Sequence, residues 1–140
     1  MIHVVIDLLK DDSDVTGMVP ANSIMPVKGE QTVERPHIIV DLLSTDLDRT
    51  KEGMVFETYN IEVYIASVGI YNAWQIHERC RVVLDNFANS NYNVTPRLGP
   101  YDIKIIRLAD ISTDAHELDD FFIIRSIYAL EMDKWNGTPA

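Results

Sequence analysis

The sequence is poor in several features that mark well-known classes of protein. Its one cysteine, Cys80, excludes an internal disulfide and leaves too few thiolates for a cysteine-based zinc site. No apolar run reaches the roughly 18 residues of a membrane-spanning helix, and the N-terminus lacks the pattern of a secretory signal. The six glycines are spread singly, so no phosphate-binding glycine loop is present. We expect a protein of a reducing compartment that has no membrane partner.

Basic residues are also scarce, because 22 acidic side chains face 12 lysines and arginines and give a net charge of −10. Proteins that grip nucleic acid through its phosphates are usually basic, so this balance argues against that class. It is compatible with a surface past which DNA slides without sticking. The length of 140 residues and the apolar fraction of 46% predict a single domain over residues 1–140.

The first part of the chain predicts a helix followed by an irregular arm. Apolar residues at Ile2, Val5, Ile6 and Leu9 have helical spacing, and "DSDVTGMV" after them offers one extra helical turn. Residues 20–36 contain three prolines and read as a Pro-containing arm, in which "SIMPV" is a short edge strand.

Period-two alternation then predicts most of the remaining elements. Strands are expected at 37–44, 56–67, 101–111 and 121–135, the last being central, and the charged stretch 45–54 reads as a projecting hairpin loop. A helix follows Gly69, with Asn72 as its cap, and its apolar face is formed by Ile76, Cys80, Val83, Leu84 and Phe87. This order predicts an α+β fold: a mainly antiparallel sheet of four to five strands with two helices packed on one face.

The stretch "DISTDAHELDDFF", residues 110–122, is the strongest candidate for chemistry. Asp114, His116, Asp119 and Asp120 could form a metal site, and a small metal-dependent hydrolase is one alternative that they leave open. The four histidines are scattered, however, and the window lacks the central glycine of a calcium loop. A solvated turn between two strands is the preferred interpretation.

Other reactive side chains are better explained by packing. Cys80 lies on the apolar helical face, where it fits a small core residue, and the neighbours His77 and Glu78 do not face one another on a helix. We therefore predict no catalytic residue, no metal and no cofactor.

The order of elements resembles the tail-completion, or tail-terminator, proteins of long-tailed bacteriophages. The resemblance covers nearly the whole chain, and its most telling parts are "RPHIIVDLL" after the arm and "YNIEVYIAS" running into the helix "NAWQIHERCRVVLDNF". It implies a structural protein of the virion tail or neck, assembled in the host bacterial cytoplasm. Such a protein forms a homo-oligomeric ring, commonly of six subunits, that caps the tail tube and joins it to the neck or head.

The resemblance also implies self-association and contacts with the tail tube protein and a neck or connector protein, while DNA passes through the lumen without specific binding. We expect each copy to need two different adhesive surfaces, because a head-to-tail contact closes a ring. The candidate partner-binding residues come from the loop, the helix and the last strand: Asp46, Asp48, Arg49, Lys51, Glu52, Trp74, Phe122, Ile124 and Tyr128. A neck protein of the same fold and an adaptor that pairs through an open sheet edge remain alternatives.

Overall fold

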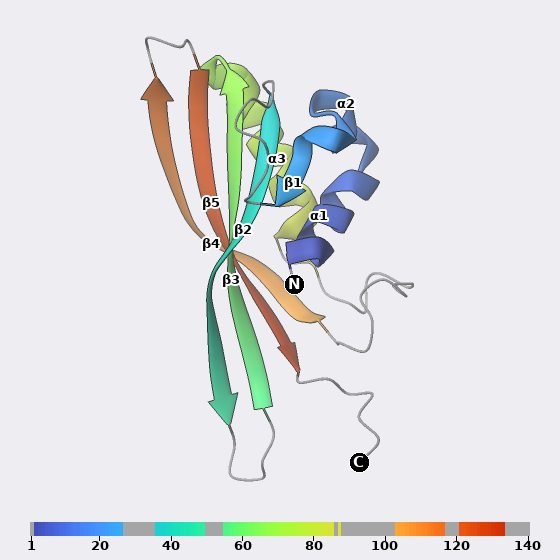
Figure 1. Ribbon diagram of the computed structural model, residues 1–140, viewed down its shortest axis with the longest axis vertical. Helices are drawn as coiled ribbons and strands as arrows, with labels where there is room; N and C mark the ends of the chain where they lie inside the picture. The colour runs from blue at the N-terminus through green and yellow to red at the C-terminus, as the bar shows by residue number, and fades with distance from the viewer. Residues whose placement is uncertain are drawn as a thin grey trace.

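The fold is a five-stranded sheet with helices on one face, as a computed structural model shows (Figure 1). The structure describes residues 2–26, 36–49, 55–85, 87, 103–116 and 121–133. The strand order is β1-β2-β3-β5-β4, and every pairing is antiparallel except the parallel pair of β1 with β2. The predicted α+β class is therefore confirmed.

Two helices open the chain. α1 (Ile2–Asp11) buries Val5 and Leu9 completely, as its helical spacing predicted. α2 (Ser13–Met18) follows at once, because the Asp12 side chain caps it by accepting hydrogen bonds from the backbone N–H groups of Asp14 and Val15. A short 3-10 turn, η1 (Ala21–Ser23), then leads into the edge strand β1 (Ile24–Pro26).

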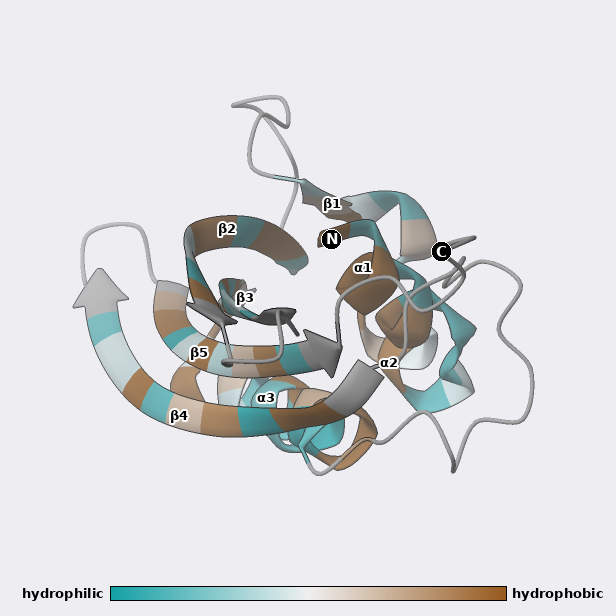
Figure 2. Ribbon diagram, turned by 90° about the horizontal axis from the view of Figure 1, so that it is seen from below, coloured by the Kyte–Doolittle hydropathy of each residue, from teal (hydrophilic) through white to brown (hydrophobic). Residues whose placement is uncertain are grey.

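The four long strands form the body of the sheet. They are β2 (His37–Arg49), β3 (Val55–Val68), β4 (Ile103–His116) and β5 (Phe121–Asp133). In β3 the side chains of Ile61, Val63 and Ile65 are fully buried, which confirms the predicted alternation. Seen along its long axis the sheet is strongly curved, and α1 lies inside the curve (Figure 2).

α3 (Ile70–Leu84) begins directly after β3. Gly69 precedes the helix with a φ of 83°, a left-handed conformation that glycine adopts without steric cost. Asn72 lies inside the first turn and its side-chain amide donates to the Val68 carbonyl, so the prediction that Asn72 caps the helix is wrong. The buried side of the helix includes Ile76, Cys80 and Leu84, as predicted.

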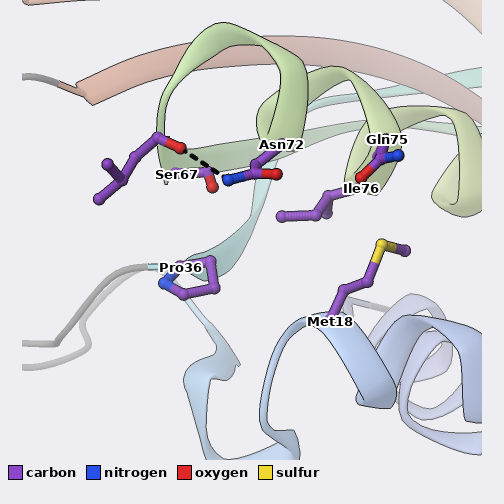
Figure 3. A pocket seen from close by; sticks show the side chains of 7 residues that line it. Met18, Pro36, Ser67, Asn72, Gln75 and Ile76 are labelled. Atoms are coloured by element: carbon purple, nitrogen blue, oxygen red, sulfur yellow. Dashed lines mark hydrogen bonds between the residues drawn. The ribbon is translucent and has the colours of Figure 1, made fainter.

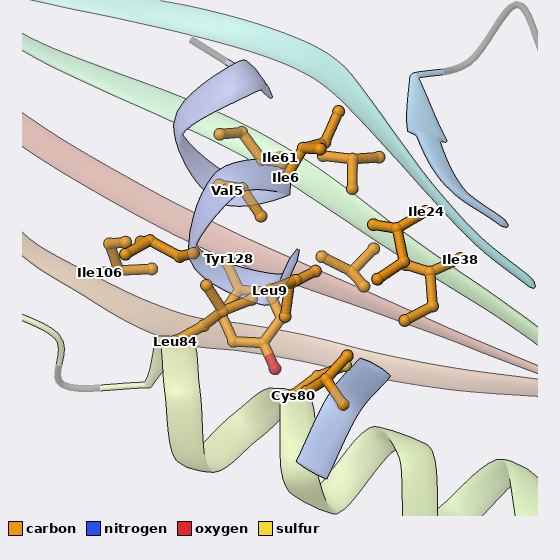
Figure 4. Packing of buried hydrophobic residues seen from close by; sticks show 14 of the residues in the cluster. Val5, Ile6, Leu9, Ile24, Ile38, Ile61, Cys80, Leu84, Ile106 and Tyr128 are labelled. Atoms are coloured by element: carbon orange, nitrogen blue, oxygen red, sulfur yellow. The ribbon is translucent and has the colours of Figure 1, made fainter. Parts of the chain in front are cut away.

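The core lies between the helices and the sheet. Tyr128 of β5 is its largest fully buried side chain, and it packs among residues of α1, α3 and the neighbouring strands (Figure 4). Ile24 of β1 and Ile38 of β2 close one end of this cluster, and Ile106 of β4 lies in it as well. Phe87 continues the layer beyond α3 through an isolated bridge to Ile106.

The predicted ends of two strands, β2 and β4, are wrong. In both cases charged residues that were expected to form a loop belong to the strand. Residues 45–49 belong to β2 and pair with 55–59 of β3, whereas 50–54 lie outside the described residues. β4 likewise continues to His116 and pairs with the start of β5, so 110–116 are strand and only 117–120 remain for a turn, outside the described residues. Of the arm, residues 27–35 are also outside the described part.

Candidate assembly surfaces

The sheet continues past the helices as a long β-hairpin. We call this the distal hairpin: residues 41–49 of β2 and 55–60 of β3 (Figure 1). β1 pairs only with residues 38–40 of β2, so it ends before the hairpin begins. Three leucines of the hairpin are exposed, Leu42 by 40%, Leu43 by 46% and Leu47 by 57%. A long edge strand with exposed apolar side chains is a typical site of protein association.

A bulge determines where these leucines lie. Leu42 pairs with Ile61 and Ser44 pairs with Asn60, so Leu43 is an extra residue in β2. Because of this extra residue, Leu42 and Leu47, five positions apart, both lie on the face of Ile61, the face that the helices cover farther up the sheet. The opposite face of the hairpin is polar: the Asn60 amide donates to Ser44 at 2.8 Å and to Asp46 at 3.2 Å.

The second surface is a groove along the outer side of α3, which we call the α3 groove. Its volume is about 500 Å³, and its walls come from α2 and α3: Met18, Tyr71, Trp74, Gln75, Glu78, Arg79 and Val82. Tyr71 is 73% exposed and Val82 is 65% exposed, although both are large apolar side chains on a helix whose other side is already in the core. An amphipathic helix normally presents polar residues to solvent, so this face departs from the usual pattern.

An ion pair holds the two walls of the groove together. The Arg79 guanidinium of α3 donates from Nε and Nη2 to the two carboxylate oxygens of Asp12, at 3.1 and 2.8 Å. These bonds hold the pKa of Asp12 below its usual range, against an opposing effect of burial. Asp14 adds a second contact to Arg79 at 3.3 Å. The end of α2 is thereby fixed beside α3.

A smaller pocket adjoins the groove where β2 and β3 meet the helices. It has a volume of about 200 Å³ and shares Met18 and Gln75 with the groove (Figure 3). Its other lining residues are Pro36, Ser67, Val68, Asn72 and Ile76, and the Asn72 side-chain amide donates to the Val68 carbonyl. The described residues that line the pocket present amide and hydroxyl groups, and none of them has a charged side chain.

Two polar side chains are buried between α3 and β5. The Ser126 hydroxyl and His77 Nδ1 are 3.0 Å apart, while His77 Nε2 and the Tyr128 hydroxyl have no hydrogen-bond partner among the described residues. Trp74 packs edge-on against the His77 ring, with centroids 5.4 Å apart. Burial lowers the pKa of His77 and raises that of Tyr128, and it raises the pKa of the Cys80 thiol to about 12. These groups are neutral at physiological pH.

Some of the predicted partner-binding residues are described and not fully buried, some lie outside the described residues, and two are buried in the core. Asp46 is exposed on the distal hairpin and Trp74 lines the α3 groove, while Asp48 and Arg49 lie in strand β2. Lys51 and Glu52 fall outside the described residues, and Phe122 is half-buried on β5. Ile124 and Tyr128 are fully buried in the core of their own chain, so their prediction as partner-binding residues is wrong.

The alternative metal site receives no support from the part of the chain that is described. Asp114 is exposed on β4, the side chain of His116 is not described, and Asp119 and Asp120 lie outside the described residues. Among described residues, no three His, Cys, Asp or Glu side chains are grouped so that they could hold a metal ion. Within the same residues, no helix has the length and apolar character needed to cross a membrane.

Sequence reasoning did not identify Tyr71, Val82 or the three hairpin leucines as surface residues. The sequence could have identified Tyr71 and Val82, because both lie on the opposite side of the helical wheel from the buried Cys80. The shared face of Leu42 and Leu47 could not be predicted from the sequence, because strict alternation places them on opposite faces and only the bulge at Leu43 brings them to the same one.

Comparison with known proteins finds similarity among solved structures. No family model matches the sequence, and no curated protein matches it. Among solved structures, a chain from the virion of a native gene transfer agent particle has a TM-score of 0.68 and 11% sequence identity. The match covers 92% of this chain and 91% of that chain. At this identity the likeness shows a shared fold.

Proposed function

We propose that this protein is a structural virion protein, a ring-forming tail terminator that caps the tail tube of a long-tailed phage and joins it to the neck or head. The single observation that carries this proposal is the fold shared with a virion chain over 92% of the length. The sequence resemblance to tail-completion proteins points independently in the same direction. The protein is then an assembly component and has no catalytic role.

The exposed apolar surfaces support a role in assembly. The distal hairpin and the α3 groove both present large apolar side chains to solvent, and they are different surfaces on different elements. Two different complementary surfaces on one chain produce a head-to-tail contact, which closes into a ring when the rotation per subunit allows it. The family resemblance suggests six subunits.

The charge distribution is consistent with passage of DNA through such a ring. The chain carries −10 overall, and a lumen lined by carboxylates repels phosphates. In this proposal the distal hairpin, with Asp46, Asp48 and Arg49, contacts the tail tube or neck protein, together with the predicted contact residues Lys51 and Glu52, which lie outside the described residues. DNA then slides past without specific binding.

A neck protein of the same fold is the second candidate. The matched chain is described only as part of a whole virion, so the shared fold suits a position on either side of the tail-to-neck joint. The two roles differ in the partner that the ring binds first, because a terminator stops tube growth and a neck protein does not.

Two measurements test the proposal. Light scattering after size-exclusion chromatography is expected to give a multimer near six chains, and electron micrographs of the same sample are expected to show rings of uniform diameter. The isolated ring should then stop polymerisation of the cognate tail tube protein at a fixed length. A monomer at every concentration, with no effect on tube length, would contradict the terminator role.

A further inference from the structure

β4 is an edge strand, because the sheet ends with it in the order β1-β2-β3-β5-β4. One side of its backbone pairs with β5, and open N–H groups on the other side of an edge strand are a template for pairing with another molecule. The Ile106 N–H points away from β5, since its acceptor is the Phe87 carbonyl. The register, with its shift after Leu108, gives the N–H groups of Leu108, Ile111 and Thr113 the same outward direction.

Two of these outward N–H groups are already bonded to the segment that follows α3. The Ile106 N–H donates to the Phe87 carbonyl at 2.9 Å, and this contact forms an isolated bridge that imitates a partner strand at one position. The Leu108 N–H donates to Asp85 Oδ1, also at 2.9 Å. A strand arriving from another copy would therefore find both donors occupied.

Asp85 and Phe87 are held in place by the end of the helix and by the core. Asp85 is the C-cap of α3, and its N–H donates to the Arg81 carbonyl at 2.8 Å. The second carboxylate oxygen of Asp85 contacts Arg81 Nε at 3.4 Å. The Phe87 N–H donates to the Leu84 carbonyl at 3.2 Å, and the Phe87 side chain is buried in the core cluster. Both acceptors that cover β4 are thus fixed by contacts of their own.

A third outward N–H group is covered from within β4. The Ile111 N–H donates to Asp110 Oδ1 at 2.9 Å, directly after the register shift between Leu108 and Asp110. Bulges and charged side chains are two devices by which natural sheets protect their edges. For the Thr113 N–H, in contrast, the described residues provide no acceptor. The protected part of the edge therefore runs from Ile106 to Ile111.

We infer that Asp85 and Phe87 form a strap that, together with Asp110, seals the edge of β4, so that copies of this chain do not join sheet to sheet through it. Asp85 is the residue to test, because its acceptor is a side chain that a substitution removes while the Phe87 backbone contact stays. The inference does not depend on the proposed ring. It argues against the alternative in which an adaptor pairs through the β4 edge.

Residue-resolved amide hydrogen exchange tests the seal in the whole chain. After correction for intrinsic rates, the wild-type Leu108 N–H is expected to exchange roughly tenfold or more slowly than the Thr113 N–H, because Asp85 accepts from the first. Asp85→Ala should remove this difference, whereas Asp85→Asn, which keeps a side-chain oxygen, should retain most of it. Equal exchange of the two groups in the wild type, or full protection of Leu108 in Asp85→Ala, would overturn the inference.

Association measures the consequence of opening the edge. At matched concentrations, Asp85→Ala is expected to form species larger than those of the wild type in light scattering, while Asp85→Asn is the matched control and should keep the wild-type mass. In the larger species the Thr113 N–H should become slow to exchange, because a second β4 would cover it. An unchanged mass, or larger species in which Thr113 still exchanges fast, would refute the inference.

Asp110→Ala provides a second variant that does not disturb the core, because Asp110 is exposed. Its circular dichroism should match that of the wild type, its Ile111 N–H should exchange faster, and its mass should increase with concentration more steeply than that of the wild type. If Asp85→Ala does not fold, a wild-type mass for Asp110→Ala decides against the seal. Each comparison is with the wild type, whether ring or monomer, so failure of the seal is distinguishable from failure of the proposed function.

Discussion

Replacement of Asp12 is expected to loosen the joint between the N-terminal helices and α3. Asp12 performs two tasks with one carboxylate: it caps α2 through the Asp14 and Val15 amides, and it binds Arg79 through both oxygens. Loss of a cap costs about 1 kcal/mol. The charged hydrogen bonds contribute about 1 kcal/mol more, a discounted value because the Arg79 side chain is 34% exposed. Asp12→Ala should therefore lower the free energy of unfolding by about 2 kcal/mol.

Two variants separate these contributions. Asp12→Asn keeps a good capping residue and loses the charge, so it should cost about 1 kcal/mol. Asp14→Asn is the matched control: Asp14 also contacts Arg79, but its side chain is 67% exposed, and the change should stay within about 0.5 kcal/mol. Urea unfolding followed by circular dichroism, at one fixed protein concentration, measures all three.

The pH dependence provides an independent check of the same ion pair. The pKa of Asp12 is lowered in the folded protein from its ordinary value of 3.8, first by the Arg79 hydrogen bonds. The stabilisation is therefore complete above the unfolded pKa and is lost as the pH falls through the folded pKa. The difference in unfolding free energy between wild type and Asp12→Asn should be constant near neutrality and shrink below about pH 4. Equal stability of Asp12→Asn and wild type at pH 7 would refute the assignment of energy to this pair.

Three further predictions concern the interior and one turn. Gly69→Ala should lower the free energy of unfolding by about 1–2 kcal/mol, because alanine is strained at a φ of 83°. A steric clash does not contribute, since an added Cβ would meet nothing within 4 Å. Thermal unfolding measures the cost, and a neutral result would mean that the backbone of the turn relaxes. The unfolding free energy should fall as the pH drops below the ordinary histidine pKa of 6.5, and the fall should end at the folded pKa, because burial lowers the pKa of His77 and the unfolded chain takes up the proton first. His77→Gln should lose this contribution, and an unchanged pH dependence in that variant would contradict it. Tyr128→Phe should leave stability unchanged or raise it by up to about 1 kcal/mol, because the buried hydroxyl has no hydrogen-bond partner among the described residues; a loss above 2 kcal/mol would reveal one.

Sequence patterns predicted the elements well where burial alone determines spacing. The alternation of Ile61, Val63 and Ile65 and the helical spacing of Ile76, Cys80 and Leu84 both correspond to buried positions. In these segments one face packs on the core and the other faces solvent, so the spacing of the apolar residues shows which face is buried. The same logic predicted that the last strand is central, and in the structure β5 lies between β3 and β4.

The errors arose where composition and geometry diverge. Residues 45–49 alternate as a strand does, but three of the five are charged, and charge density alone suggested a loop. β5 is apolar on both faces, so its sequence could not show which face meets the helices; Ile124 and Tyr128 proved to be on the covered one. The sequence of one strand cannot show whether residues 45–49 form a strand or which face of β5 meets the helices. Both depend on the elements that pack against the strand.

The exposed apolar residues Leu47 and Val82 are likewise not explained by packing within one chain. Nothing in the folding of one chain requires Leu47 or Val82 to be apolar, since they are 57% and 65% exposed and lie outside the core cluster. Polar residues there would leave the core unchanged and improve solubility, so the apolar choice suits a second packing event. Folding depends on buried residues such as Tyr128 and Leu9, whereas in the proposed assembly association depends on exposed residues such as Leu47 and Val82. A substitution in one set should leave the other process nearly intact, because the two sets do not share contacts.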